Sequence, residues 1–218
     1  MAHGSEPLTI NPKYDLCPDS RIFLHYFDQK KTDIILAIGD NDEQSAQTLT
    51  ENGYLYILGI DLRPHCRSPV TYPRLIGDFC RFQEWLPAAC CDCIYSLSAI
   101  EHFGLGTYAD SVLDPDYDMV AMNGIWNLLC NNGTCYLTVP YGREYLVHGK
   151  DWRVYDKEAL EKRLIGDFKL EQKIFFKSAH AQCPDDGGAI PLVKEKHADQ
   201  YDGSPPHLTV LLQLRKVV

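Results

Sequence analysis

The chain lacks a basic excess and a long apolar run, and each absence excludes a class of protein. Its 21 Lys and Arg residues stand against 30 Asp and Glu, which gives a formal net charge of −9. A protein that binds the phosphate backbone needs basic residues to displace counterions, so nucleic acid is excluded as a partner. No apolar run reaches the roughly 18 residues that a membrane-spanning helix needs, so no membrane association is expected.

The sequence also lacks an export signal and a complete set of metal ligands. Residues 1–5 have neither the basic nor the apolar region of a signal peptide and look like a cloning remnant. We therefore expect a cytoplasmic protein whose nine cysteines are reduced thiols. Cys90 and Cys93 have the C-x-x-C spacing of zinc ligands, but no second pair follows them. The aspartates that alternate over residues 114–118 lack the later glycine and glutamate of a calcium loop, so we expect no metal.

What the chain contains is enough for one domain with a sizeable core, because 45% of its 218 residues are hydrophobic. We expect an N-terminal lead-in over residues 1–32 and a single domain over residues 33–218. Within the lead-in, the apolar run Ile22–Phe27 predicts a short helix that packs on the sheet or covers a ligand site.

The prediction of the fold and of a cofactor site starts from the stretch Asp33–Asp42. Its apolar run ends at Gly39, a polar cluster then opens a helix, and the next apolar run ends at Asp61. Strand, glycine turn, helix, strand and carboxylate are typical of a doubly wound α/β domain that binds a nucleoside-bearing cofactor. The glycine lets the backbone approach the ligand, and the helix start offers free N–H groups. The alternative is a tight turn between a strand and a helix in any α/β protein.

Strands and helices alternate along the rest of the chain. After the first strand, apolar runs predict strands over residues 54–60, 75–76, 91–97, 135–139, 169–176 and 207–214, with helices over 43–51, 119–129 and 156–164. Only a loop, rich in Gly, Pro and Asp, joins the last two strands, which predicts an antiparallel pair. The pattern therefore indicates a mostly parallel seven-stranded sheet with an antiparallel last strand.

Two segments carry a family resemblance. Asp92–His102 resembles the fourth sequence motif of class I S-adenosylmethionine-dependent methyltransferases, and Gly133–Pro140 resembles the segment of their fifth strand. The resemblance covers about residues 33–216 and implies the Rossmann-like α/β sandwich of these enzymes. Glu101–Gly106 and Trp152–Tyr155 are also similar to a bacterial subgroup of unknown function that is associated with glycan biosynthesis.

The resemblance implies S-adenosylmethionine as the cofactor and assigns a role to each matching residue. The methionine part would face Gly39, the ribose Asp61, and the adenine Asp78 and Phe79, with Ser96 and Ser98 lining the cleft. Leu62 is also expected to bind the cofactor, and Asp40 can face the sulfonium or amino group of the methionine part. The first motif departs from the family pattern, because an acidic residue and two glycines are missing. Ala37, Asn41 and Glu43 stand in their places.

Catalytic and substrate-binding residues are expected after the fourth and fifth strands. His102 can act as a general base, and Glu101 can bind a substrate hydroxyl. The alternatives are that His102 packs under the cofactor and that Glu101 caps the following turn. Tyr141, Arg153 and Tyr155 are expected to face the substrate, although an ion pair between Arg153 and a loop aspartate is an equal alternative.

The predicted function is methyl transfer to a small-molecule acceptor, a hydroxyl of a sugar or glycan precursor, by a monomer or a homodimer. A methyltransferase-like fold that has lost its cofactor and serves as a binding or assembly module is the main alternative. A nicotinamide enzyme ranks third, because the glycines are sparse.

Overall fold

The computed structural model of the chain describes residues 16–40, 44–64, 69–108, 112–177, 190–202 and 208–218. These residues form a central sheet of eight strands, in the order β3-β2-β1-β4-β5-β10-β8-β9. Its strands are β1 (Ile34–Ile38), β2 (Tyr56–Asp61), β3 (Arg74–Ile76), β4 (Cys91–Leu97), β5 (Leu129–Tyr141), β8 (Lys169–Lys177), β9 (Leu192–Val193) and β10 (Leu208–Arg215).

Strands β1 to β5 are parallel, whereas β10 lies between β5 and β8 and is antiparallel to both. The predicted mostly parallel sheet with an antiparallel last strand is therefore confirmed. The sheet has one strand more than predicted, because β9 pairs with the outer edge of β8. That strand lies in the segment we expected to be a loop, of which residues 178–189 and 203–207 are outside the described part.

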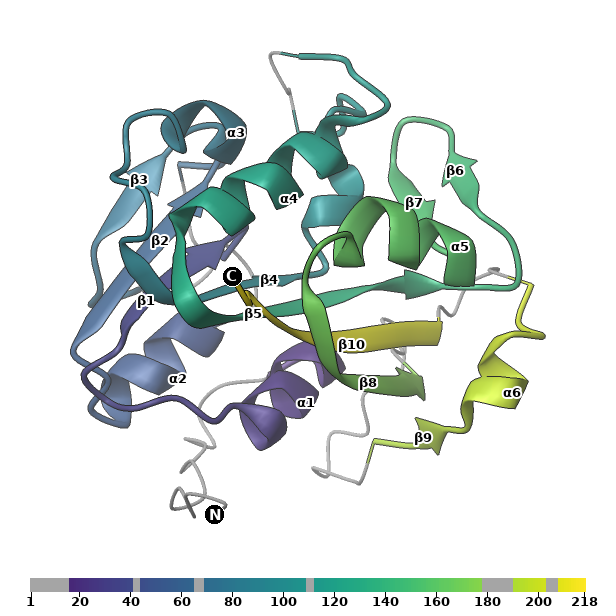
Figure 1. The fold of residues 1–218 in the computed structure, drawn as a ribbon, viewed down its shortest axis with the longest axis horizontal. Coiled ribbons are helices and arrows are strands. Elements are labelled where there is room, and N and C mark those ends of the chain that lie inside the picture. The colour runs from purple at the N-terminus through teal and green to yellow at the C-terminus, as the bar shows by residue number, and fades with distance from the viewer. Residues whose placement is uncertain (1–15, 41–43, 65–68, 109–111, 178–189, 203–207) are drawn as a thin grey trace.

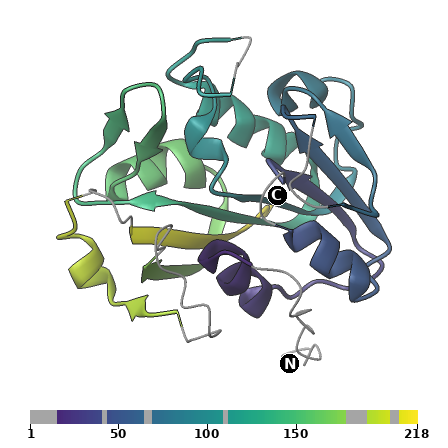
Figure 2. The ribbon, with the colours of Figure 1, turned by 180° about the vertical axis from the view of Figure 1, so that it is seen from behind.

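Helices cover both faces of the sheet (Figure 1 and, from behind, Figure 2). One face carries α1 (Pro18–Tyr26) and α2 (Ser45–Glu51). The other carries α3 (Phe79–Phe82), α4 (Tyr117–Leu128) and α5 (Lys157–Ala159), which continues as the π-helical turn η2 (Leu160–Ile165). A second sheet, formed by β6 (Leu146–His148) and β7 (Trp152–Val154), follows β5, and α6 (Glu195–Ala198) follows β9.

Side chains of β1 alternate between two apolar cores, as a strand buried on both faces requires. Leu36 and Ile38 join the core under α4 and η2, whereas Ile35 and Ala37 join the core under α1 and α2. All four are buried. The apolar run before Gly39 therefore predicted both the strand and its burial.

Helix α1 belongs to the second of these cores. Phe23 is fully buried, and its ring centroid lies 4.5 Å from that of Tyr95 in β4 and 5.5 Å from that of Tyr136 in β5. The helix starts four residues earlier than the apolar run suggested, because Cys17 caps it and Pro18 occupies its first turn. The lead-in thus brings α1 onto the sheet that follows it.

The observed starts of α4 and β5 differ from the predicted ones. Helix α4 starts at Tyr117 rather than Met119, and β5 starts at Leu129, six residues before the strand predicted over residues 135–139. The register between β4 and β5 is irregular there, which accommodates the extra residues. Asp42, which directly precedes the helix predicted over residues 43–51, lies outside the described residues. In the described part of the chain, no helix is long and apolar enough to cross a membrane.

Candidate functional site

The candidate site lies where the order of the parallel strands reverses, between the carboxyl ends of β1 and β4. Ligands of open α/β sheets bind at such a switch point. Gly39 follows β1 with φ +73°, and a Cβ atom there would overlap the side chain of Ala99, which follows β4. Glycine is therefore required here by both its backbone conformation and the close approach of the two strand ends.

Asp61 ends β2 beside this switch point, and its carboxylate is bound by a near neighbour. Its Oδ1 accepts from the backbone N–H of Arg63 at 2.7 Å and from Nε of the same residue at 3.0 Å, and Oδ2 accepts from a terminal guanidinium nitrogen at 3.1 Å. The Asp61 side chain is 3% exposed, and that of Arg63 is 29% exposed. The carboxylate predicted to accept the ribose thus lies beside the switch point, but it is bound by an arginine.

Asp40 is turned away from the end of β1. Its carboxylate accepts hydrogen bonds from the hydroxyl of Tyr72 and from the Arg74 guanidinium, and it lies where a Cβ atom of Gly59 would be. Burial raises the pKa of Asp40, and the hydrogen bond from Tyr72 and the charge of Arg74 offset part of that rise. The expectation that Asp40 faces the methionine part of a cofactor is therefore corrected, because the side chain is a buried partner of β2 and β3.

Asp78 stands at the start of α3 and links that helix to α4. One oxygen accepts from the N–H of Cys80 at 2.9 Å and caps α3, and the other accepts from the hydroxyl of Tyr117 at 2.7 Å. The neighbouring Phe79 has its side chain buried in the core. The predicted adenine acceptor thus has a structural partner on each oxygen and keeps a second lone pair on each.

The two serines of β4 differ in position. Ser96 is fully buried within the strand, and its hydroxyl has no hydrogen-bond partner among the described residues, so the expectation that it lines the cleft is corrected. Ser98 follows the strand in a left-handed conformation, with φ 44°. Its hydroxyl donates to the carboxylate of Asp19 in α1, and its N–H donates to Thr138 in β5. Helix α1 thus contributes a carboxylate to this edge of the sheet.

Glu101 and His102 lie on the short 3-10 turn η1 (Ile100–His102) directly after Ala99. Ring atom Nδ1 of His102 contacts the carbonyl oxygen of Asp151 in the β6–β7 hairpin. A carbonyl only accepts hydrogen bonds, so this contact assigns the hydrogen of a neutral imidazole to Nδ1 and makes Nε2 the basic nitrogen. Nε2 lies 3.8 Å from Oε1 of Glu101, whose side chain is 2% exposed, against 16% for that of His102.

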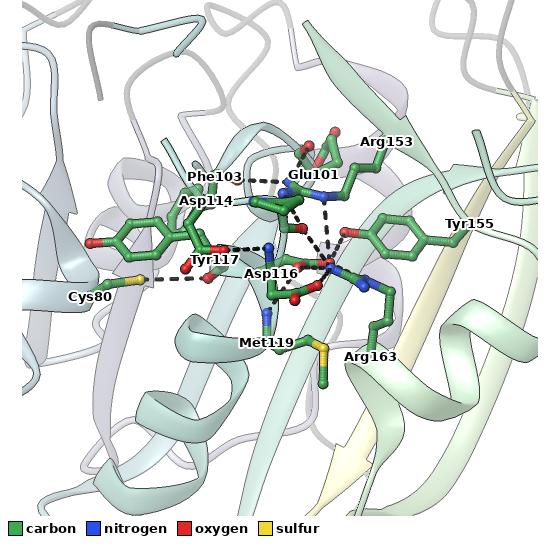
Figure 3. Close-up of polar contacts among 12 residues, drawn as sticks. Cys80, Glu101, Phe103, Asp114, Asp116, Tyr117, Met119, Arg153, Tyr155 and Arg163 are labelled. Atoms are coloured by element: carbon green, nitrogen blue, oxygen red, sulfur yellow. Dashed lines mark hydrogen bonds and ion pairs between the residues drawn. The ribbon is translucent and has the colours of Figure 1, made fainter. Parts of the chain in front are cut away.

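A buried arginine fixes the main chain on both sides of His102. Arg153 of β7 donates from one terminal nitrogen to the carbonyls of Glu101 at 3.0 Å and Phe103 at 2.7 Å, and from the other to Pro115 at 2.9 Å. Figure 3 shows its guanidinium, together with Arg163 and Tyr155, pointing into one cluster. The turn that carries His102 is therefore tied to the hairpin and to the loop before α4.

Asp118 supplies the negative charge of this cluster. Its carboxylate lies 3.7 Å from Nε of Arg153 and accepts from Arg163 at 2.6 and 2.9 Å and from the Tyr155 hydroxyl at 2.9 Å. Asp118, Arg153 and Tyr155 are fully buried. Burial raises the pKa of Tyr155 well above its usual value, and the charge of Asp118 adds to this effect.

The three predicted substrate residues therefore have structural partners instead. Arg153 and Tyr155 belong to the Asp118 cluster, so Arg153 pairs with an aspartate as the alternative expected, but this aspartate lies in the first turn of α4 and not in a loop. Tyr141 is buried and donates to Asp199, next to α6, at 2.6 Å. We correct the expectation that these side chains face a substrate, since none of them is exposed.

Sequence reasoning missed two neighbours of the predicted residues. Arg63 stands two residues after Asp61, and its guanidinium carbon lies 4.8 Å from the ring centroid of Tyr108. That ring in turn contacts His102 edge-on, with 5.2 Å between centroids. The signal available was the short spacing between an acidic and a basic residue, which allows a local ion pair but does not indicate its geometry.

Within the described ranges, no group of three or more His, Cys, Asp or Glu side chains is placed to hold a metal ion. Burial raises the pKa values of Cys91, Cys93 and Cys135, so these thiols behave as small apolar side chains.

The side chains present fit the adenosine half of S-adenosylmethionine. A ribose offers two hydroxyl donors and adenine an amino donor, and Asp61 and Asp78 are acceptors at the ends of β2 and β3 beside the switch point. The methionine half would lie against the turn after Gly39, where residues 41–43 are outside the described part. Asp40, the described acidic residue of that turn, points elsewhere.

Comparison with known proteins gives one partial family match. A model of the family "Caenorhabditis protein of unknown function, DUF268" matches residues 78–171, which is less than half of the chain. No curated protein matches the sequence.

Solved structures show the fold more fully. A 1,6-didemethyltoxoflavin-N1-methyltransferase from Burkholderia thailandensis, with S-adenosylhomocysteine bound, is 15% identical, with a TM-score of 0.58 over 92% of this chain and 77% of that one. A SAM-dependent methyltransferase from Methanosarcina mazei is 11% identical, with a TM-score of 0.56 over 94% of this chain and 100% of that one. Phosphoethanolamine N-methyltransferase 2 from Haemonchus contortus, also with S-adenosylhomocysteine, is 15% identical, with a TM-score of 0.58 over 91% and 52%.

These similarities establish the Rossmann-like methyltransferase fold for this chain. The neighbours are S-adenosylmethionine-type enzymes that act on different substrates, so the fold alone does not identify an acceptor. The predicted likeness to a bacterial glycan-associated subgroup stays a prediction.

Proposed function

We propose that the protein transfers a methyl group from S-adenosylmethionine to a hydroxyl of a small molecule. The observation that carries this proposal is the orientation of His102. Its Nδ1 is committed to the Asp151 carbonyl, which directs the basic Nε2 toward Glu101 at the carboxyl end of β4. Ala99, three residues before His102, packs closely against Gly39, which supports placing the base near the expected cofactor turn.

The residues of this chain would divide the work between binding and proton removal. A bound sulfonium cofactor supplies the methyl group, and Asp61 and Asp78 would hold its adenosine part. A hydroxyl that is methylated must lose its proton, and Nε2 of His102 is the group that would accept it. The carboxylate of Glu101, 3.8 Å away, would stabilise the imidazolium that forms. Arg153 would hold the main chain of this turn in place.

We propose a hydroxyl of a sugar or glycan precursor as the acceptor. Support comes from the sequence resemblance of Glu101–Gly106 and Trp152–Tyr155 to the glycan-associated subgroup, and from a histidine base suited to hydroxyl deprotonation. The acidic net charge favours a neutral or cationic small molecule over an anionic polymer.

A second candidate is a binding or assembly module that has the methyltransferase fold without the cofactor. The observation that favours it is the loss of charge near the first turn. Ala37 stands where the family has an acidic residue, and the carboxylate of Asp40 is bound by Tyr72 and Arg74.

Calorimetric titration with S-adenosylmethionine and S-adenosylhomocysteine, with NAD as the control ligand, separates the two candidates. The enzyme predicts micromolar binding of the first two and none of NAD. Asp61→Ala should abolish this binding while the circular dichroism spectrum and the unfolding midpoint stay close to wild type. Absence of binding at millimolar ligand would instead favour the module, and unchanged affinity in Asp61→Ala would reject the ribose assignment.

A further inference from the structure

The contact between Asp61 and Arg63 occupies the group that a ribose would need. A carboxylate has about four acceptor positions. Arg63 alone takes three of them, through its backbone N–H, its Nε and a terminal nitrogen. At most one position is left for a ligand. Two ribose hydroxyls need two positions, so both can bind only if the Arg63 side chain withdraws.

The main-chain contact between these residues does not depend on the side chain. The N–H of Arg63 donates to Oδ1 of Asp61 at 2.7 Å and would do so in any residue except proline that replaces the arginine. The turn after β2 is therefore held without the guanidinium. The side chain is about one third exposed, and ion pairs at such positions contribute little to stability.

The Arg63 side chain also reaches the catalytic side of the site. Its guanidinium lies over the ring of Tyr108, which makes a T-shaped contact with the ring of His102. The loop of Tyr108 is fixed to the β6–β7 hairpin by Thr107, whose hydroxyl donates to the Asp151 carbonyl at 3.0 Å. Withdrawal of Arg63 from Asp61 would therefore also change the contact between Arg63 and Tyr108, the side chain that packs on His102.

We propose that Arg63 is an internal competitor for the ribose site: its guanidinium occupies Asp61 until an adenosine ligand displaces it, and its departure releases Tyr108 from the Arg63 contact beside His102. This inference rests on the proposed function, because it assumes that Asp61 is a ribose acceptor. It makes Arg63 a residue that lowers the affinity of the site, an effect opposite in sign to that of an ordinary binding residue.

Calorimetric titration with S-adenosylhomocysteine tests the competition. Arg63→Ala should bind the probe about two- to fivefold more tightly than wild type, the range that a partly exposed ion pair allows. Arg63→Lys retains one charge without the planar fork and should fall between the two, and it serves if the alanine variant folds poorly. The affinity of wild type should rise between low and high salt, because screening weakens the ion pair, and that of Arg63→Ala should stay flat.

Tyr108 gives a second and independent variant. Tyr108→Phe keeps the ring under the guanidinium and should match wild type, whereas Tyr108→Leu removes the cation–π contact and should shift the affinity in the direction of Arg63→Ala.

The outcomes distinguish a failure of the competition by Arg63 from a failure of the cofactor assignment on which it rests. If wild type binds the probe and Arg63→Ala binds it equally or more weakly, the competition is refuted while the cofactor assignment stands. If neither wild type nor either Arg63 variant binds, both the competition and the cofactor assignment are refuted.

Discussion

The carboxylate of Asp40 occupies the space that a side chain at Gly59 would fill, so the turn after β1 and the middle of β2 share one volume. This relationship explains both the glycine at position 59 and the direction of the Asp40 side chain. Gly59 must lack a Cβ atom for Asp40 to reach Tyr72 and Arg74, and Asp40 reaches them only by leaving the end of β1. A carboxylate that would otherwise face a ligand has become part of the sheet's packing.

Asp40 predicts a pH dependence of stability. Its pKa is raised in the folded protein by burial, so the folded state holds the proton more tightly than the unfolded chain. The stability that this group contributes is fully present below the unfolded value of about 3.8 and is lost as the pH rises through the higher folded pKa. Relative to Asp40→Asn, wild type should therefore lose free energy of unfolding as the pH rises from 4 to 7. Urea denaturation measures this.

Asp167→Asn is the matched control for that experiment, because Asp167 is exposed. A wild type that gains stability over Asp40→Asn as the pH rises would contradict the raised pKa.

Gly39 and Gly149 separate backbone strain from close packing. Both have positive φ, +73° and +59°, but only at Gly39 would a Cβ atom meet a neighbour, the side chain of Ala99. Either alanine substitution should cost about 1–2 kcal/mol from the left-handed backbone. Gly39→Ala should cost measurably more in urea denaturation and should weaken the binding of S-adenosylhomocysteine. Equal losses at the two positions would show that the approach of β1 and β4 is not tight.

The buried cluster of Asp118, Arg153 and Tyr155 predicts a large loss of folding stability when the carboxylate of Asp118 is removed. Asp118→Asn leaves Arg153 fully buried without a full negative partner, and a change of this kind costs about 3–5 kcal/mol. The unfolding free energy from urea denaturation measures it. Glu158→Gln, which removes a solvent-exposed pair with Lys162, is the comparison and should leave the midpoint unchanged.

Replacement of His102 is expected to lower the rate of methyl transfer without changing the affinity for the cofactor. His102→Gln should lower the rate of methyl transfer by about 10²–10⁴-fold, the usual contribution of a positioned base. The affinity for S-adenosylhomocysteine should not change, since the proposed ribose and adenine acceptors lie at the end of β2 and at the N-cap of α3. A radiolabelled methyl-transfer assay and calorimetry measure the two quantities. A large loss of affinity would instead indicate that His102 packs under the cofactor.

The buried thiols predict a labelling pattern. Burial raises the pKa values of Cys91, Cys93 and Cys135, so almost no thiolate forms there at pH 8. Iodoacetamide should leave these three unmodified in the native protein and modify all nine cysteines in denaturant, as mass spectrometry can show. The half-buried Cys90 is the internal comparison. Native labelling of Cys135 would show that the centre of β5 opens.

The sequence predicted the parts of this fold that depend on short-range patterns. The apolar run before Gly39 marked β1, and the carboxylate after the next run marked the end of β2. The loop between the last two predicted strands indicated that β10 would be antiparallel. Each of these rests on the order of residues within one segment, which hydrophobic periodicity records.

Side-chain direction at the site was not predictable in the same way. Asp40 and Arg63 were visible as charges, but the sequence does not show that one turns toward Tyr72 and the other folds back on Asp61. Asp118 and Arg163 are 45 residues apart and meet only because α4 and η2 pack together. Such contacts are consequences of tertiary packing, which local patterns do not contain.

The position of β10 has a consequence for synthesis. Strand β10 pairs along its length with both β5 and β8, so the outer strands β8 and β9 have nothing to join until residues 208–215 have left the ribosome. The half of the sheet that carries Gly39, Asp61 and His102 is complete in sequence well before that moment. A nascent chain would therefore expose the edge of β5, an open template for wrong pairing, for as long as those last residues are being made.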